Sequence, residues 1–403
     1  MQFDNHPNIA KLYLSNFFTG FVFWYAIEKL FMQSINISPF GVGLNAVVFL
    51  AITVIFDVPS GVLADRWRRK YILISAIVSL GVGTTILGLS DSFVFYLIGT
   101  VFYGFYVVLT SGTFQAIMYD SLAEAGRQDQ YDKHQGRSYG LFLGGIGLGS
   151  LAGGYIGASI GLREAYLYSM VSIVINILIL CMMREPKFHK EIFDSAMVSH
   201  IKASIALIKS HSIVAHLAFF LIVAGILRSM QNEFGSLYYM ALGLSTVTMG
   251  YVNAGKWLFG ALGQLIAPYV GRVRSLAFVP WLFVIFLAFS ILPGLFGLVF
   301  FFLAALLFSV ISNQSEAVIQ SYIPSGLRAT SLSLISFASN IVLIPLSLLF
   351  GWMVEQQDVF KAYQVVGLLG ILYTCIWLVK GRPHISKFIE QPPVLSKKID
   401  IIK

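Results

Sequence analysis

The sequence has few charged residues and almost no cysteine. Of its 403 residues, 11% are Asp, Glu, Lys or Arg and 57% are hydrophobic, whereas about a quarter of the residues in ordinary soluble domains are charged. A soluble domain of this length could not cover so much apolar surface with so few polar side chains. The two cysteines, Cys181 and Cys375, both fall in apolar stretches. We therefore expect no disulfide framework, no metal site and no cofactor.

Long apolar runs are what the sequence has in abundance. Each is about 20 residues long, enough to cross the hydrocarbon core of a bilayer. The first run, from Ile9 to Gln33, is too long and too aromatic for a cleaved signal peptide, so we interpret it as a retained helix. The sequence therefore predicts an all-α, multi-pass membrane protein. Twelve spans are expected, at residues 9–33, 41–64, 71–90, 93–119, 138–160, 164–183, 212–236, 246–270, 274–292, 296–320, 329–353 and 359–380.

Positive charge is distributed unevenly among the connections between these spans. Most of the 27 Lys and Arg residues fall on one side, with Arg163 and Lys361 on the other. Lys and Arg are retained in the cytoplasm, and an even number of spans places both termini on that same side. We expect a monomeric protein of the cell (inner) membrane, surrounded by the lipid bilayer. The same distribution argues against a nucleic-acid-binding patch, despite the net charge of +8.

The longest internal connection lies at the middle of the chain, at residues 184–210. It is expected to separate an N-terminal six-helix bundle at 1–183 from a C-terminal bundle at 211–383, which is followed by a cytoplasmic tail at 384–403. Weak internal repetition supports two halves, because the second and eighth spans carry similar stretches near their ends. Parallel six-helix repeats are typical of transporters that bind a solute at midplane between the halves.

The second half of that connection has an amphipathic pattern. Its isoleucines share one helical face and its lysines lie on another, which predicts a helix on the cytoplasmic membrane surface. A solvated linker is the alternative. The residues concerned are Ile201, Ile205, Ile208, Lys202 and Lys209.

The connection after the second span carries a motif. Gly61, Asp65, Arg66, Arg69 and Lys70 follow the pattern Gly-x-x-x-Asp-Arg/Lys-x-Gly-Arg/Lys-Arg/Lys, with an arginine at the position of its second glycine. This stretch resembles the loop between helices 2 and 3 of the major facilitator superfamily, whose members carry small solutes across membranes. The resemblance implies two six-helix bundles and transport by alternating access.

The resemblance also implies a cytoplasmic gate. In the family, the motif aspartate (here Asp65) approaches the start of helix 11, and the motif arginine pairs with an acid at the end of helix 4. Asp120 fits that acid. We therefore expect Gly61, Asp65, Arg66, Arg69 and Asp120 to form a latch. Plain positive-inside topology is the alternative, and it explains the cations but not the two acids.

The fifth expected span is rich in glycine. Gly145, Gly149, Gly153 and Gly154 leave a helix face without side chains, which lets another helix approach closely. Their spacing resembles the family's helix-5 antiporter motif, with Ser150 in place of its proline. That motif is associated with drug-for-proton exchangers and implies export. A common packing device is the alternative interpretation.

Ionisable residues inside the expected spans are candidates for the transport chemistry, because each needs a partner or a wet cavity. Glu28, Asp57 and Glu316 are the candidate proton carriers, since burial favours the neutral form of a carboxyl group. A gate-pairing role for Asp57 and a structural role for Glu316 stay open. Glu28 and Lys29 are adjacent, so we expect them to face different ways.

Lys256 lies closest to the expected midplane. A buried lysine is either paired with a carboxylate or neutral, so Lys256 is either a structural ion-pair partner or a residue that acts on the solute. Trp24, Tyr25, Arg228 and Tyr238 are the other candidates for lining a substrate cavity. Glu233 is expected near the outer end of its helix, as an interfacial residue.

These features predict a secondary active transporter, and most simply proton-coupled export of a small, largely apolar solute. The alternative is a proton-coupled symporter that imports a polar or anionic nutrient, for which Arg228 and Lys256 are suited. A lipid flippase is a third possibility. We expect no enzyme, because the sequence has no Gly-x-Ser-x-Gly, metal cluster or phosphate-binding loop.

Overall fold

A computed structural model describes residues 7–66, 68–186, 197–270, 272–292, 294–323 and 325–381, which form helices and their connections without a strand. The first eight helices are α1 (Pro7–Gly20), α2 (Glu28–Ser34), α3 (Pro39–Arg66), α4 (Arg69–Leu89), α5 (Phe93–Thr110), α6 (Thr113–Glu124), α7 (Tyr131–Ser159) and α8 (Leu162–Cys181). The others are α9 (Met197–Ser210), α10 (Ser212–Ala241), α11 (Thr246–Val270), α12 (Arg272–Ala277), α13 (Val279–Ile291), α14 (Leu295–Tyr322), α15 (Ser325–Gln356) and α16 (Val359–Ile376).

Nine helical segments within the described residues are long and apolar enough to cross a membrane. They coincide with nine of the twelve predicted spans. The predicted span at 9–33 is divided between α1 and α2, and the one at 274–292 between α12 and α13. The span at 246–270 forms one helix, α11, but polar residues such as Asn253, Lys256 and Gln264 reduce its hydropathy.

The chain forms two compact units. Unit 1 contains Met1–Glu191, Met230–Leu258 and Leu343–Ala362. Unit 2 contains Ile192–Ser229, Phe259–Val342 and Tyr363–Lys403. Helices α10, α11, α15 and α16 each contribute residues to both units. The units are spatial groupings, and the predicted domain boundaries at residues 183 and 211 remain predictions.

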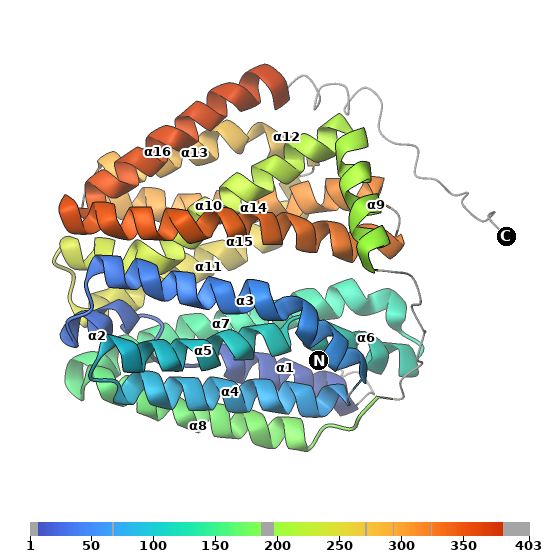
Figure 1. Cartoon of the computed structure of the whole chain (residues 1–403), viewed down its shortest axis with the longest axis horizontal. Helices are drawn as coiled ribbons and strands as arrows, with labels where there is room; N and C mark the ends of the chain where they lie inside the picture. Colours follow the sequence, from blue (N-terminus) through green and yellow to red (C-terminus); the bar gives the residue numbers. More distant parts are fainter. Residues whose placement is uncertain are drawn as a thin grey trace. The chain divides into compact units, whose positions relative to one another are not determined.

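In unit 1, α4 packs against α5 and α8, while α1 packs against α7 and α8 (Figure 1). Glycine makes the first of these contacts close. A Cβ atom on Gly83 of α4 would lie 3.0 Å from the carbonyl oxygen of Gly99 and 3.0 Å from the amide nitrogen of Tyr103, both in α5. Membrane helices associate through such small-residue contacts because lipid gives no hydrophobic drive for apolar faces to associate.

Unit 2 has an aromatic core. Phe283 and Phe289 of α13 lie 5.0 Å, between ring centroids, from Tyr373 and Tyr363 of α16 respectively. These four side chains and Phe301 of α14 pack in tilted and edge-on arrangements, which the ring quadrupoles favour. Aromatic side chains thus hold α13, α14 and α16 together.

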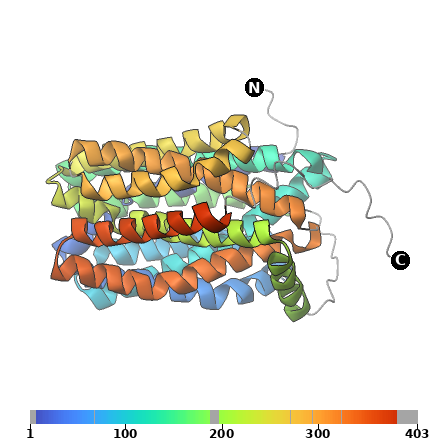
Figure 2. The ribbon, with the colours of Figure 1, turned by 90° about the horizontal axis from the view of Figure 1, so that it is seen from above.

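Helix α9 follows a direction different from that of α10 in both views (Figures 1 and 2). On α9, Lys202 and Lys209 are exposed, Ile205 is 40% exposed, and Ile201 and Ile208 are half-buried. The structure thus contains the predicted helix within residues 184–210. Its position on a membrane surface remains a prediction.

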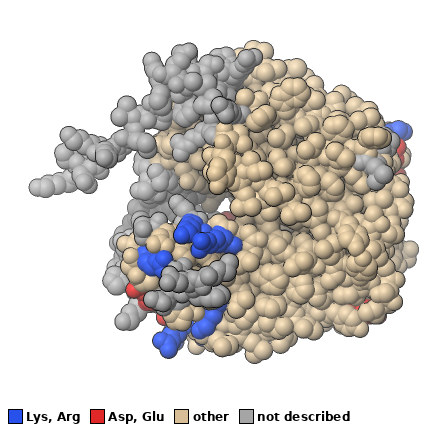
Figure 3. Space-filling model, turned by 180° about the vertical axis from the view of Figure 1, so that it is seen from behind, with Lys and Arg blue, Asp and Glu red and all other residues tan. Residues whose placement is uncertain are grey.

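Charged side chains are sparse over much of the surface. The face drawn in Figure 3 has a wide band of described residues with few charged groups, and its Lys and Arg side chains gather mainly at one end. A band with so few charged groups suits a lipid environment.

Candidate functional site

The interrupted first span creates the candidate site. Helix α1 ends at Gly20, and α2 begins at Glu28. Our prediction of one continuous helix over 9–33 was therefore wrong. Residues 21–27, the interrupted segment of this span, connect the two helices. Helix α8 holds this segment in place, because the Ser169 hydroxyl accepts a hydrogen bond of 2.8 Å from the amide of Phe23. Non-helical backbone within a membrane protein is tolerated where protein or a wet cavity surrounds it.

The glycines of α7 make room for this segment. A Cβ atom on Gly145, Gly149 or Gly153 would overlap the backbone of residues 17–23. At Gly153 the overlap is with the carbonyl oxygen of Phe23. Gly154 instead faces Gly250 of α11, whose Cα atom would lie 3.0 Å from an added Cβ. The structure thus gives all four glycines a packing role, the alternative left open by the sequence.

A cavity of about 240 Å³ lies within unit 1. The interrupted segment and α2 line it together with parts of α3, α4, α5, α7, α10 and α11. Four of the lining side chains carry a carboxyl or an amino group: Glu28, Lys29, Glu233 and Lys256. Their formal charges cancel, so the cavity is highly polar and neutral when all four are ionised.

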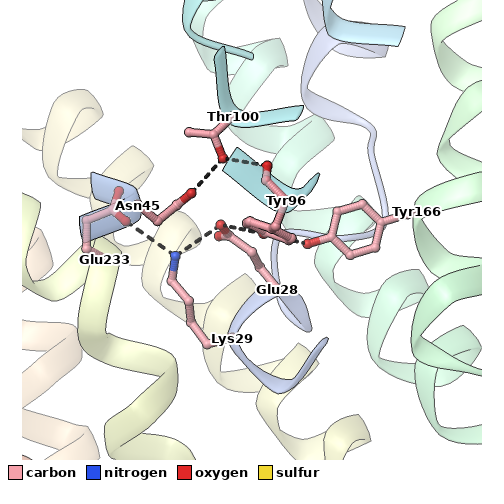
Figure 4. A network of polar contacts seen from close by, with 7 residues as sticks. All are labelled: Glu28, Lys29, Asn45, Tyr96, Thr100, Tyr166 and Glu233. Carbon is pink, nitrogen blue, oxygen red and sulfur yellow. Dashed lines mark hydrogen bonds and ion pairs between the residues drawn. The ribbon is translucent and has the colours of Figure 1, made fainter. Parts of the chain in front are cut away.

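Lys29 bridges two carboxylates (Figure 4). Its Nζ lies 3.0 Å from Oε1 of Glu28 and 3.3 Å from Oε2 of Glu233 in α10. The Lys29 side chain is 2% exposed, while those of Glu28 and Glu233 are 22% and 31% exposed. A buried ammonium group needs such partners, because leaving water costs several kcal/mol per ion in real proteins. Our expectation that Glu28 and Lys29 face different ways was wrong.

Hydroxyl and amide groups extend the network from Glu28 (Figure 4). The Tyr96 hydroxyl of α5 donates to Oε1 of Glu28 at 3.3 Å and lies 3.2 Å from the hydroxyl of Tyr166 in α8. Nearby, the Thr100 hydroxyl donates to Oδ1 of Asn45 at 2.6 Å. Glu28 is thus held by an ion pair with Lys29 and by a hydrogen bond from the Tyr96 hydroxyl.

Lys256 lies on α11, at another part of the cavity wall. Its side chain is 8% exposed, and its Nζ donates to Oδ1 of Asn232 at 3.1 Å. The same Nζ lies 4.7 Å from the ring centroid of Trp257, in cation–π geometry. The structure thus places Lys256 in the cavity lining together with Trp24 and Tyr25, two other candidates.

Three buried hydrogen-bond donors in the lining have no partner among the described residues. They are Nε1 of Trp24, Nε2 of Gln231 and Nε1 of Trp257. Each unsatisfied buried donor costs about 1–3 kcal/mol, so native structures seldom keep several together without a use. A solute with acceptor oxygens would satisfy them.

The other candidates lie outside the cavity lining. Arg228 is in unit 2, with its guanidinium carbon 5.0 Å from the ring centroid of Phe308. Tyr238 is buried against Phe360, at 5.1 Å between ring centroids. Asp57 is exposed on α3 and Glu316 is exposed on α14. Of the three acids predicted to carry protons, the structure therefore places only Glu28 in the cavity.

The predicted gate is described in part. Arg69 at the start of α4 forms an ion pair with Asp120 of α6. Gly61, Asp65 and Arg66 belong to α3, but their side chains lie outside the described residues. Lys70 binds the end of α8, because its Nζ donates to the carbonyl oxygen of Cys181 at 2.7 Å.

Replacing Asp120 with asparagine is expected to lower the free energy of unfolding by about 1–3 kcal/mol, because the partly buried Arg69 then loses its charged partner. Denaturant unfolding in detergent measures this loss, and exchanging the two residues (Arg69→Asp with Asp120→Arg) is expected to restore part of it. Asp91→Asn is the control, since Asp91 pairs with Arg163 but is 79% exposed. Equal stability of Asp120→Asn and the wild type would contradict the role of this pair.

Sequence reasoning missed Lys29 and Glu233 as a pair. They are 204 positions apart, and each was interpreted separately. The sequence signal that could have joined them is charge pairing itself, since a lysine inside a span requires a carboxylate. Asn232 and Trp257 were missed because amides and tryptophans are frequent in membrane helices without any such role. No group of three potential metal-ligating side chains occurs in the part of the chain that the structure describes.

Comparison with known proteins gives a family match, a curated relative and similar solved structures. Residues 10–347 match the family described as the Major Facilitator Superfamily. A curated relative, the probable galactarate/D-glucarate transporter GudP of Bacillus subtilis (strain 168), is 30% identical over 175 residues, or 37% of this chain. That match spans 38% of the relative's length.

Solved structures share the fold. A crystal structure of a D-xylose-proton symporter matches with a TM-score of 0.73 and 16% identity, covering 93% of this chain and 97% of that one. A crystal structure of the nucleoside transporter NupG matches with a TM-score of 0.70 and 16% identity, covering 94% and 98%. These matches confirm the predicted fold class, an all-α membrane protein of twelve spans in two bundles.

Proposed function

Because the chain belongs to the Major Facilitator Superfamily, we propose that it is a proton-coupled secondary active transporter that moves a small anionic solute by alternating access. Members of this family are transporters and not enzymes, so the cavity is interpreted as a binding site. The observation that carries the proposal is the cluster of Glu28, Lys29, Glu233 and Lys256 in one cavity. Intramembrane ionisable groups of this kind mark substrate and proton pathways.

An anionic solute suits the unused hydrogen-bonding capacity of the cavity. The two carboxylates already form ion pairs with Lys29. The unpartnered groups named above are all donors. A solute rich in acceptor oxygens, such as a hydroxylated carboxylate, would satisfy them. The similarity to a probable galactarate/D-glucarate transporter supports a solute of this chemistry.

Export of a largely apolar solute is the second candidate. Trp24, Tyr25 and Tyr103 give the cavity an aromatic side, which supports it. The glycines whose spacing resembles an antiporter motif make packing contacts, which the alternative interpretation of that spacing explains without export. Four ionisable side chains would be costly to desolvate against an apolar solute, so the anionic solute is the better supported one.

The remaining sequence predictions complete the proposal. The chain would act as a monomer in the cell (inner) membrane, with both termini in the cytoplasm and its two sequence halves joined by residues 184–210. The concentration of Lys and Arg on one side of the expected spans supports this orientation.

Glu28→Gln is expected to abolish transport driven by a pH gradient, because glutamine cannot exchange a proton. The measurement is uptake and efflux of D-glucarate and galactarate by proteoliposomes under an imposed pH gradient, with internal pH followed by a trapped dye. Solute-for-solute exchange should persist in Glu28→Gln, since glutamine keeps the size and an acceptor oxygen. Gradient-driven transport at the wild-type rate would remove Glu28 from the coupling mechanism.

A panel of aromatic cations in the same assay separates the two candidate functions. Gradient-driven movement of those compounds, with no movement of carboxylates, would establish the apolar alternative.

A further inference from the structure

We propose that the end of α8, together with Lys11 of α1 and Lys70 of α4, binds the phosphate group of an anionic phospholipid. The inference concerns the surface of unit 1 and goes beyond the proposed transport, since it does not depend on the solute in the cavity. Its basis is a pair of ammonium groups that meet at one helix end, next to exposed apolar side chains. We call Lys11, Lys70 and the carbonyl groups that they bind the lysine site.

Both lysines bind the same short stretch of backbone. Helix α8 ends at Cys181 and packs against both α1 and α4. Nζ of Lys11 donates to the carbonyl oxygen of Met182 at 2.6 Å. Nζ of Lys70 donates to the carbonyl oxygens of Cys181 at 2.7 Å and Met183 at 2.8 Å. Carbonyl groups at a helix end have no partner within the helix, so they draw the two ammonium groups to one place.

The charges at the lysine site do not balance. The carbonyl end of a helix carries about half a negative charge, which offsets only part of the two positive charges. Glu185 adds a carboxylate, but its Oε2 accepts a hydrogen bond of 3.1 Å from the backbone amide of Lys70. Arg68 and Arg184 lie close by in the sequence, are both exposed, and add two positive charges. The local balance is therefore positive, which favours an anion there.

The two ammonium groups also keep hydrogen-bonding capacity. An ammonium group has three N–H donors, of which Lys11 uses one and Lys70 uses two within the described part of the chain. The remaining donors suit the oxygens of a phosphate group. The backbone beside them is fixed, because the Asn8 side chain donates to the carbonyl oxygen of Arg184 at 2.9 Å and accepts from its amide at 3.1 Å. A site that is fixed before binding loses less entropy when its ligand arrives.

Exposed apolar side chains extend from the lysine site toward the middle of the helices. Leu14 lies one turn along α1 from Lys11, and Leu178 lies one turn before Met182 at the end of α8. Both leucines are exposed, as are Met182 and Tyr71 at the start of α4. A phospholipid joins a phosphate group to acyl chains, so it can use the ammonium groups and the apolar side chains together. A soluble phosphate would use the ammonium groups alone, and the apolar side chains therefore favour a lipid.

Native mass spectrometry of the purified full chain in detergent tests the lysine site. The probes are phosphatidylglycerol and phosphatidylcholine with identical acyl chains, so the two lipids differ in the charge of the headgroup. For the first lipid bound, the wild type is expected to bind phosphatidylglycerol at least about tenfold more tightly than phosphatidylcholine. In the double variant Lys11→Gln with Lys70→Gln, which keeps N–H donors but removes both charges, this ratio should fall below about twofold.

The matched control is Lys133→Gln with Lys361→Gln, which also removes two lysine charges, from side chains that are exposed elsewhere. It should keep the wild-type preference for phosphatidylglycerol. The double variant Lys11→Arg with Lys70→Arg keeps both charges and should keep most of that preference too. A wild-type preference in the double glutamine variant would overturn the lysine site, as would equal binding of the two lipids by the wild type.

Hydrogen exchange of the wild type gives a second measurement that does not depend on how a variant folds. The amides of residues 181–186 are expected to exchange at least about threefold more slowly with phosphatidylglycerol than with phosphatidylcholine, because a ligand that binds the folded state opposes local opening. Equal protection by the two lipids would overturn the proposal. The same protection by inorganic phosphate alone would overturn it in favour of a site for soluble anions. None of these results bears on the solute of the cavity, which the proteoliposome assay tests separately.

Discussion

Replacing Lys29 with methionine is expected to lower the free energy of unfolding by about 3–5 kcal/mol, the largest stability effect among the changes considered. Methionine has a similar length and keeps the packing of a side chain that is 2% exposed. What is lost is the positive charge between Glu28 and Glu233. Two carboxylates would then face each other in a partly buried site without a cation to hold them.

Denaturant unfolding in detergent measures this effect, with Lys361→Met as the control. Lys361 pairs with Asp358 at 3.8 Å, but its side chain is 60% exposed, so its loss should cost less than about 1 kcal/mol. A triple variant that adds Glu28→Gln and Glu233→Gln should recover most of the stability, because no unpaired charge remains. If Lys29→Met unfolds like the wild type, the ion pairs are not important for stability.

Gly153→Ala is expected to disrupt transport more than any other single methyl addition. The new Cβ would overlap the carbonyl oxygen of Phe23, and backbone cannot move aside as a flexible side chain can. The interrupted segment must then shift, together with Trp24 and Tyr25, which line the cavity. Overpacking of this kind costs about 1–3 kcal/mol, and we expect anion binding to weaken by at least about tenfold.

Gly147→Ala is the matched control, because an added Cβ at Gly147 has no heavy atom within 4 Å. Both variants lie on α7, six residues apart in the sequence, and differ in what the methyl group meets. Calorimetric anion binding and proteoliposome transport are measured for both. Equal binding by the two variants would show that the close contact between α7 and the interrupted segment does not position the site.

The sequence allowed most helices to be predicted, because apolar runs of membrane length have few other uses. It did not allow the interruption at residues 21–27 to be predicted. That stretch, Phe-Val-Phe-Trp-Tyr-Ala-Ile, contains neither proline nor glycine and continues the apolar run. What interrupts the helix is tertiary contact, since the glycines of α7 and the hydroxyl of Ser169 hold the segment in another conformation. Local pattern cannot reveal a contact of that kind.

The sequence allowed several residues of the candidate site to be predicted, but not the ion pairs that they form. Glu28 and Lys256 stood out because charges inside spans are costly, and both line the cavity. Lys29 did not stand out, because adjacent residues on a continuous helix point about 100° apart. Glu28 is the first residue of α2, next to the interruption, and two long side chains can converge there.

The equal numbers of acids and lysines in the cavity have an electrical consequence. Moving one elementary charge across a membrane at 100 mV changes the free energy by about 2.3 kcal/mol. An empty carrier whose cavity charges cancel, as those of Glu28, Glu233, Lys29 and Lys256 do, returns across the membrane without moving cavity charge through this field. Loading one proton with one carboxylate keeps the cavity neutral. If the loaded carrier holds one proton and a solute with one net negative charge, we expect the membrane potential neither to drive nor to hinder either step. A dicarboxylate such as D-glucarate, loaded with one proton, would instead carry one negative charge through the field.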